Sequence, residues 1–348
     1  MENQFLGNQH FNISNQVVSA TCPSNIALIK YWGKYANQIP ANPSISYTLN
    51  HCNTQTSMEF LANERFSVQT FLAGNEELKF AEKIEKYLKN IEQYLPWILK
   101  GKYIIKTENT FPHSSGIASS ASGFGAIASC LMELDKVFTN TEIDVKKTSF
   151  LARLGSGSAC RSLYNGLVVW GKTDEVEGSS DLYAVKYPDE EIHPIFKNFN
   201  DWVLLIHEGQ KTVSSTVGHG LMNTNPYAER RFQEASENFV PLKEILKTGN
   251  LEKFITLVEH EALTLHAMMM MSEPACILMK TGTLEVINKL WKFREETGNP
   301  LFFTLDAGAN VHLLFPENES TEAIKKFIET ELLQHTQKGG VVKDVMRF

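Results

Sequence analysis

A stretch rich in glycine and serine, residues 111–126, constrains the fold of this chain more than any other segment. It leads into residues 127–134, which are apolar enough to form a buried helix. Glycine lets the backbone approach a ligand closely, and the free N–H groups and dipole of a helix N-terminus favour a negative charge. The stretch therefore predicts an anion site. A simple capped helix is the alternative, because the stretch matches neither of the two commonest nucleotide loops.

The composition is that of an ordinary globular protein of 348 residues, with 43% hydrophobic and 21% charged residues. The formal net charge of −7 and the lack of a basic block argue against a nucleic-acid partner. Five scattered cysteines without C-x-x-C spacing argue against disulfides or a zinc site and favour a reducing compartment. Since the start is polar and no apolar run reaches the length of a membrane span, we expect a cytoplasmic protein without a membrane partner.

The periodicity of apolar residues predicts an α+β protein with two layered domains. Alternating or apolar runs predict strands at residues 17–22, 44–49, 54–60, 66–71, 102–106, 167–170, 202–206, 301–305 and 311–315, with one more in the tail. Helical spacing predicts helices at residues 80–99, 127–134, 144–154, 226–248, 251–271, 283–297 and 322–333.

Several finer expectations follow from local composition. Residues 1–15 are polar and predict a loose arm, and residues 23–25 should break the first strand. Strands 44–49, 54–60 and 66–71 should form an antiparallel set, and the helix 226–248 should be interrupted near Pro241. A charged, loop-rich segment after residue 172 predicts a domain boundary near residue 190, which gives domains 1–190 and 191–348.

Three side chains on separate segments could act together on a phosphorylated substrate. Lys30 lies in an apolar run, where a lysine either faces an anion or extends its amine to the surface. Arg161 lies in a second small-residue loop and has the fork geometry that pairs with carboxylate or phosphate. Asp306 ends an apolar strand, where it either bonds its own turn or serves as a base. Each feature is weak alone, but together they are typical of a phosphotransfer site.

Five segments closely resemble, in the same order, the motifs of the diphosphomevalonate decarboxylases, a family of the GHMP kinase superfamily. The two that are specific to the decarboxylases lie within residues 25–34 and 155–162, whereas the serine loop alone indicates only the superfamily. The five segments are NIALIKYWGK (25–34), GIASSA (116–121), GSGSACRS (155–162), VSST (213–216) and DAGAN (306–310).

The resemblance implies a fold and a reaction. The expected fold has a ribosomal-S5-like N-terminal domain and a ferredoxin-like C-terminal domain, with the site in the cleft between them. The expected cofactors are ATP and Mg²⁺, and the expected assembly is a homodimer. The expected reaction phosphorylates the tertiary 3-hydroxyl of mevalonate 5-diphosphate, after which phosphate and carbon dioxide leave to give isopentenyl diphosphate.

The resemblance also implies residue roles. Asp306 matches the catalytic base, Arg161 the arginine that holds the substrate carboxylate, and Lys30 the lysine near the reacting centre. Further residues match contacts to the substrate and its phosphates: Tyr31, Lys34, Ser156, Ser158 and, in the C-terminal segment, Ser215, with Lys83 as an added cation. The ATP phosphates would lie on Gly116, Ala118, Ser119, Ser120 and Ser122, with Ser120 also at Mg²⁺.

Some positions depart from the family pattern and keep alternatives open. Pro43 and Ala309 stand where relatives usually have serine and proline, and Thr216 stands where some bacterial members place an arginine for the diphosphate. A mevalonate 5-phosphate decarboxylase or a mevalonate 3-kinase is therefore the first alternative. A non-catalytic nucleotide-binding regulatory protein is the second. His260 and His266 share one predicted helix, and we expect them on its polar face or at a cleft edge rather than at a metal.

Overall fold

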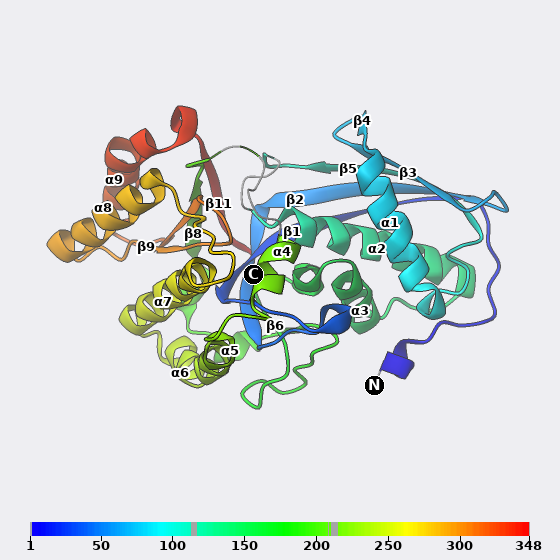
Figure 1. The fold of residues 1–348 in the computed structure, drawn as a ribbon, viewed down its shortest axis with the longest axis horizontal. Coiled ribbons are helices and arrows are strands. Elements are labelled where there is room, and N and C mark those ends of the chain that lie inside the picture. The colour runs from blue at the N-terminus through cyan, green and yellow to red at the C-terminus, as the bar shows by residue number, and fades with distance from the viewer. Residues whose placement is uncertain (1, 113–116, 208, 210–214, 348) are drawn as a thin grey trace.

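The computed structural model describes residues 2–112, 117–207, 209 and 215–347, and these form a mixed sheet covered by helices (Figure 1). Eleven strands in this part of the chain join in one sheet, whose main path runs β4-β3-β5-β2-β11-β8-β10-β9, with β1 and β6 also on β2 and β7 on β6. The strands are β1 (Gln16–Ile29), β2 (Ser44–Ala62), β3 (Ser67–Leu72), β4 (Asn75–Glu76), β5 (Gly101–Asn109), β6 (Leu167–Trp170), β7 (Val185–Lys186), β8 (Phe199–Leu204), β9 (Phe302–Thr304), β10 (Val311–Pro316) and β11 (Val341–Arg347).

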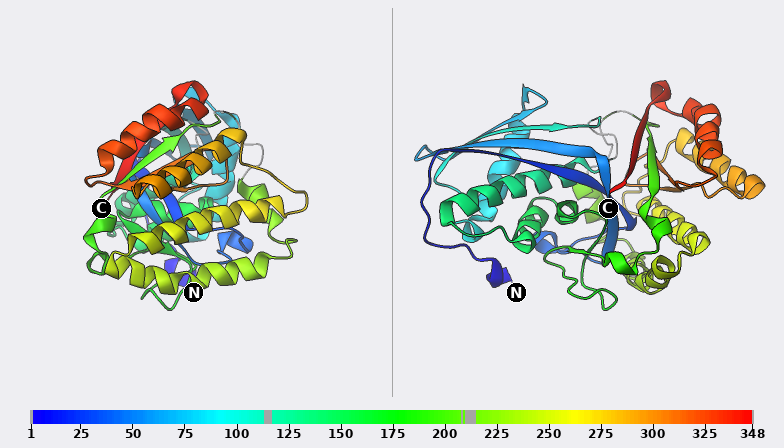
Figure 2. Two further views of the ribbon diagram at one scale, coloured as in Figure 1. Left: turned by 90° about the vertical axis from the view of Figure 1, so that its left-hand side faces the viewer. Right: turned by 180° about the vertical axis from the view of Figure 1, so that it is seen from behind.

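The last strand joins the two halves of the molecule. Strand β11 pairs antiparallel with β8 from Val341 to Val345, and its end then pairs with β2 through Met346 and Arg347. Figures 1 and 2 show this red strand running from the C-terminal half to the centre, where it meets the blue β2. The α+β class is therefore confirmed, and the tail adds the strand that the sequence predicts.

Helices of the N-terminal half pack against one face of the sheet. They are α1 (Leu78–Asn90), α2 (Ser119–Thr139) and α3 (Val145–Gly155). Helix α2 lies closest to the sheet, and a Cβ at Gly125 would lie 3.2 Å from Ser162 Cβ and 3.3 Å from Cys22 Cβ. A larger residue at position 125 would therefore push α2 away from β1 and from the loop that carries Arg161. The helix ends at Asn140, whose left-handed φ of 53° stops further winding.

Helices of the C-terminal half cover β8–β10. They are α5 (Ala228–Glu237), α6 (Phe239–Thr248), α7 (Leu251–Met270), α8 (Thr281–Thr297) and α9 (Thr321–Phe327). The predicted interruption near Pro241 is real, but it falls at Asn238, and Pro241 is the third residue of α6. Proline is tolerated there because the first N–H groups of a helix have no partner within the helix. Asn250 caps α7 by accepting a hydrogen bond from the Lys253 N–H at 3.1 Å.

Three local expectations are wrong. Pro23 does not end β1: the strand continues to Ile29, with a shift of register between Pro23 and Asn25. Strand β2 is continuous, because residues 50–53 between the two predicted strands stay extended. Strand β3 pairs in parallel with β5 and not with β2. The segment between β3 and β5, which contains helix α1, crosses over and so brings the two strands into the same direction.

The N-terminal arm is not loose. A short 3₁₀ helix, Glu2–Phe5, docks on the N-terminal half, and the buried Phe5 ring stacks on Phe150 with centroids 4.5 Å apart. The Glu2 carboxylate accepts hydrogen bonds from the buried Arg153, at 3.2 Å, and from the Tyr94 hydroxyl, at 3.1 Å. The polar composition misleads here because one aromatic ring and one ion pair are enough to hold the arm. Among the described helices, none has both the length and the apolar character that a membrane span requires.

We expect Phe5→Ala to lower the free energy of unfolding by about 3 kcal/mol, because it removes a buried aromatic ring and leaves a cavity. Chemical denaturation measures the change. Leu6→Ala is the matched control, since Leu6 is 51% exposed, and its effect should stay within about 0.5 kcal/mol. Equal effects of the two substitutions would contradict a docked arm.

Candidate active site

A lysine and an aspartate from the two halves of the chain meet at the centre of the molecule. Lys30 directly follows β1 and is 1% exposed, and Asp306 follows β9. The Lys30 Nζ atom donates a hydrogen bond to Asp306 Oδ1 at 3.2 Å. Burial lowers the pKa of Lys30, and the negative charge of Asp306 opposes that shift. The predicted lysine and aspartate therefore lie together, although 275 residues separate them in the sequence.

Arg161 lies beside this pair in the 3₁₀ segment Gly157–Leu163 and is 2% exposed. Its Nε donates to Asn25 Oδ1 at 3.2 Å, and its Nη1 donates to the Ser44 hydroxyl. Desolvation lowers the pKa of this guanidinium, and the charge of Asp306 is among the influences that raise it. No carboxylate among the described residues forms an ion pair with it. A buried cation held only by neutral partners can accept an anionic ligand group.

Tyr31 points its hydroxyl into the same region. The buried oxygen has no hydrogen-bond partner within the described part of the chain, and burial raises the pKa of the phenol. A Cβ at Gly157 would lie 2.8 Å from this oxygen, so only glycine leaves room for the hydroxyl there. The orphaned donor fits a ligand that supplies an acceptor.

The two serine loops lie next to each other at the start of α2. Ser156 Oγ donates to the exposed Ser120 Oγ at 3.5 Å. Ala118 is the N-cap residue, left-handed with φ 36°, and no side chain caps the helix there. Within the described part of the chain, the N–H groups of Ser119 and Ser120 have no hydrogen-bond partner, so with the helix dipole they remain for an anion.

The other predicted loop residues have different surroundings. Ser122 is buried, and its hydroxyl lies 2.6 Å from Thr54 Oγ1, so it faces the sheet and not the loop. Ser158 is half-buried, and its carbonyl accepts a hydrogen bond from Asn25 Nδ2 at 3.2 Å. Gly116 lies outside the described residues.

Two more lysines, Lys34 and Lys83, lie close enough for their charges to repel each other. Lys34 Nζ donates to Gln38 Oε1 at 2.8 Å, and Lys83 Nζ lies 4.8 Å from the centroid of the Phe124 ring. Desolvation lowers the pKa of both ammonium groups, and the charge of Lys34 lowers that of Lys83 further. Neither forms an ion pair with a carboxylate in the described chain. Two like charges without a counter-ion fit a site for a phosphorylated group.

Ser215 begins helix α4 (Ser215–Leu221), and its side chain lies outside what the structure describes. The same helix carries His219, which the sequence analysis missed. Its ring stacks between Tyr31 and Trp32, with centroids 4.3 Å and 4.6 Å away, and its Nδ1 accepts a hydrogen bond from the Gly33 N–H at 3.0 Å. Helix α4 thereby holds the Lys30–Gly33 segment.

The two histidines of α7 have different environments. His260 is exposed and lies 2.7 Å from Glu234, as a residue on a polar face should. His266 is buried, and its Nε2 bonds the Asp306 carbonyl at 3.1 Å. Desolvation lowers the pKa of His266 to about 4, so the neutral ring donates to that carbonyl. No sequence signal could have separated the two histidines, because the partner of His266 is a backbone atom 40 residues away.

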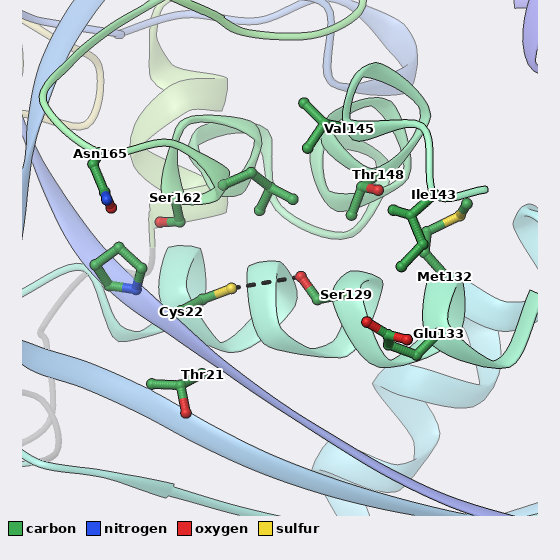
Figure 3. Close-up of a pocket in the computed structure, with 12 residues that line it drawn as sticks. Thr21, Cys22, Ser129, Met132, Glu133, Ile143, Val145, Thr148, Ser162 and Asn165 are labelled. Atoms are coloured by element: carbon green, nitrogen blue, oxygen red, sulfur yellow. Dashed lines mark hydrogen bonds between the residues drawn. The ribbon is translucent and has the colours of Figure 1, made fainter. Parts of the chain in front are cut away.

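A separate cavity of about 260 Å³ lies between helices α2 and α3 and strand β1 (Figure 3). Helices α2 and α3, the middle of β1 and the segment after Arg161 line it, and none of the predicted site residues does. Its wall includes Ser162, which accepts a hydrogen bond from Asn25 Nδ2 at 2.8 Å. Asn25 thus contacts both Arg161 and a residue that lines this cavity.

No cluster of three or more His, Cys, Asp or Glu side chains suited to a metal ion occurs in the described chain. Mg²⁺ is commonly held by few protein oxygens together with substrate phosphates. The exposed Ser120 hydroxyl beside a helix N-terminus fits such a shared site.

Comparison with known proteins identifies the family. The α+β fold, with a small-residue loop before a buried helix and a lysine–aspartate pair between the halves, is that of a GHMP-kinase-type enzyme. Two family models match: the diphosphomevalonate decarboxylase-like N-terminal domain over residues 22–184, and the mevalonate 5-diphosphate decarboxylase C-terminal domain over residues 202–345.

Curated relatives and solved structures agree. The diphosphomevalonate decarboxylase of Saccharomyces cerevisiae is 31% identical over 322 residues, which cover 87% of this chain and 78% of that protein. The Schizosaccharomyces pombe enzyme is 32% identical, with coverage of 87% and 79%. The mevalonate diphosphate decarboxylase structure from Staphylococcus aureus is 28% identical with a TM-score of 0.81, covering 96% of both chains. MDDEF in complex with MVAPP, AMPPCP and magnesium is also 28% identical with a TM-score of 0.81, covering 96% of this chain and 98% of that one.

The chain belongs to the diphosphomevalonate decarboxylase family, and it is a decarboxylase enzyme. This confirms the family, the enzyme class and the GHMP-kinase fold that the motifs predict.

The buried His219 should make stability depend on pH. Burial lowers its pKa from 6.5 to about 3, so the unfolded chain binds more protons between these values. The stability contributed by the neutral ring is complete above about pH 6.5 and is lost as the pH falls towards 3, at up to roughly 1.4 kcal/mol per pH unit. We expect denaturation of His219→Gln to show a shallower loss across this window. Parallel curves for the two proteins would contradict a neutral, buried His219.

Proposed function

We propose that the chain converts mevalonate 5-diphosphate and ATP to isopentenyl diphosphate, ADP, phosphate and carbon dioxide. Family membership supports this reaction, as does the MDDEF structure, which contains MVAPP and AMPPCP. One observation carries the proposal at atomic level. Arg161 is a buried cation without a carboxylate partner in the described chain, and it lies beside the Lys30–Asp306 pair. A substrate carboxylate would supply the missing charge while its 3-hydroxyl faces Asp306.

In the first step, Asp306 would accept the proton of the 3-hydroxyl as that oxygen attacks the γ-phosphoryl group and ADP leaves. Lys30 would stay protonated and offset the negative charge gathered around the transferred group. The tertiary alcohol thereby becomes a phosphate ester, which is a better leaving group.

In the second step, the C3–O bond breaks and releases phosphate. The bond between the carboxyl carbon and C2 then breaks, carbon dioxide leaves, and its electron pair forms the C2–C3 double bond. Arg161 would hold the carboxylate in the orientation that lets this bond align with the developing empty orbital at C3.

ATP and Mg²⁺ fit the start of α2. The uncapped N–H groups of Ser119 and Ser120, with the Ser120 and Ser156 hydroxyls, would hold the phosphates. When bound, Mg²⁺ would neutralise charge on the phosphates and align the transferred group. Gly116, Ala118 and Ser122 would act through their backbone.

Lys34 and Lys83 favour a 5-diphosphate over a 5-monophosphate. Lys34 is half-buried and Lys83 is exposed, and neither has a carboxylate partner in the described chain, so each ammonium group can pair with a different phosphate of a diphosphate. Tyr31, Ser158 and Ser215 would complete the contacts with the substrate.

We also propose a division of the chain into residues 1–190, with the ATP-phosphate loop, and residues 191–348, which supply Asp306. The limits of the two family models, 22–184 and 202–345, support this division. The homodimer that the resemblance implies and the cytoplasmic location that the composition favours stay proposals.

Turnover with three substrates tests the reaction. Purified protein is mixed with ATP, Mg²⁺ and either mevalonate, its 5-phosphate or its 5-diphosphate, while ADP and carbon dioxide are followed separately. We expect both products at equal rates with the 5-diphosphate. ADP without carbon dioxide would indicate a 3-kinase, and no turnover with any substrate would favour the regulatory alternative.

Asp306→Asn should lower kcat roughly 100- to 10,000-fold, because an amide cannot accept the hydroxyl proton. Binding of ATP, measured by calorimetry, should persist because the ATP site lies on the other half of the chain. A variant with the parent rate would remove Asp306 from the mechanism.

Lys83→Met should raise KM for the 5-diphosphate roughly 10- to 100-fold, the cost of one charge-assisted contact. It should change KM for the 5-phosphate much less. Lys86→Met is the matched control, since Lys86 lies on the same helix and, like Lys83, is exposed. An unchanged preference between the two substrates would exclude Lys83 from the diphosphate site.

A further inference from the structure

The backbone of Lys30 is held by side chains and not by a neighbouring strand. Its N–H donates to Glu261 Oε2 at 2.9 Å, and its carbonyl accepts from Asn42 Nδ2 at 3.0 Å. Lys30 therefore sits just beyond the regular part of β1, in a position set by Asn42 on one side and by helix α7 on the other. The position of the Lys30 ammonium group therefore depends on both of these backbone contacts.

Glu261 is fully buried and is itself held by three further donors. Arg231, from α5, donates both terminal nitrogens to its two oxygens, one of them at 3.2 Å. Asn238 Nδ2 donates to Oε1 at 2.6 Å. With the Lys30 N–H, the carboxylate accepts four hydrogen bonds, so its orientation is strongly determined.

A buried ion pair such as Glu261–Arg231 is a costly way to stabilise a fold. Burial of two charges removes their hydration, and an apolar replacement is often as stable or more so. Here the buried pair has a second consequence, because the same carboxylate both binds Arg231 and fixes the backbone of a residue in the candidate active site.

We propose that Glu261 is a positioning residue for the reaction, acting through Lys30. Its carboxylate holds the Lys30 backbone where the ammonium group meets Asp306, and its negative charge helps to keep that group protonated. This inference rests on the proposed function for the part that Lys30 plays in phosphoryl transfer. Glu261 does not touch the reacting atoms itself.

The charges around Lys30 agree with this role. Burial is the largest influence and lowers its pKa, whereas Asp306 and Glu261 raise it, and Arg161 lowers it. His266, on the same helix as Glu261, is neutral at ordinary pH because desolvation lowers its pKa to about 4. Arg231 faces Glu261 from α5 and moderates its field. Removal of the Glu261 charge should therefore let Lys30 lose its proton at lower pH.

Helix α7 also supplies a matched control. Glu259 lies two residues from Glu261 and is nearly buried, and it accepts two hydrogen bonds from Arg294 and one from Trp291. Its substitution removes a partly buried ion pair from the same helix, and Glu259 makes no contact with Lys30 among the described residues. Glu259→Gln therefore reports the loss of stability alone.

The test compares Glu261→Gln, Glu261→Asp and Glu259→Gln in the full chain, with kcat corrected for the folded fraction. We expect Glu261→Gln to lower kcat roughly 10- to 100-fold with little change in KM for ATP, as for a small misplacement of a catalytic group. The alkaline limb of its kcat–pH profile should move to lower pH. Glu261→Asp keeps the negative charge but shortens the side chain by one methylene group. Its kcat should therefore fall, while the alkaline limb of its kcat–pH profile stays at the same pH.

Glu259→Gln should keep both kcat and the profile. Equal losses of kcat in the Glu259 and Glu261 variants, or an unmoved alkaline limb in Glu261→Gln, would overturn the proposal. If the parent protein lacks turnover, the proposed function fails. The effect of Glu261 on Lys30 is then tested without turnover, by NMR titration of the Lys30 ammonium group with labelled lysine. A Lys30 titration that is the same with and without the Glu261 charge would overturn the inference.

Discussion

The contact between Lys30 and Asp306 is the interaction on which the site depends, because it exists only when the two halves of the chain are joined. Lys30 comes from the end of β1, and Asp306 comes from the end of β9. Strand β11 makes the junction possible, since it pairs with β8 on one side and with β2 on the other. Helix α7 adds Glu261 behind Lys30 and His266 behind Asp306. Helix α7 thus contacts both members of the Lys30–Asp306 pair.

An excess of positive charge without carboxylate partners characterises the candidate site. Arg161 is buried, Lys34 is half-buried and Lys83 lies at the surface, and none of them has a carboxylate partner among the described residues. Desolvation of a cation without a counter-ion costs free energy, and an anionic ligand relieves that cost when it binds. A protein of net charge −7 can therefore attract a highly anionic substrate into one place, because the positive charges are local.

Sequence patterns predicted the long regular elements well and the irregular ones poorly. The predicted helix 251–271 agrees with α7 within a residue, because its apolar stripe repeats over many turns. The break at Pro23 was wrong, since a strand can absorb a proline at a shift of register. The docked N-terminal arm was missed because its composition is polar, while one ring, Phe5, does the packing. Among the site residues, motif resemblance pointed to Lys30, Arg161 and Asp306, which the fold then brought together.

The sequence by itself determined the family, the α+β class and the residue types needed for phosphoryl transfer, because these depend on short motifs and on local periodicity. Only the tertiary structure decided which side chains support that set. His219 on α4, Glu261 and His266 on α7 act on backbone groups far away in the sequence, and such contacts leave no spacing to read. Burial, too, is a property of the fold: it lowers the pKa of Lys30 and leaves Arg161 without a counter-ion in the described chain.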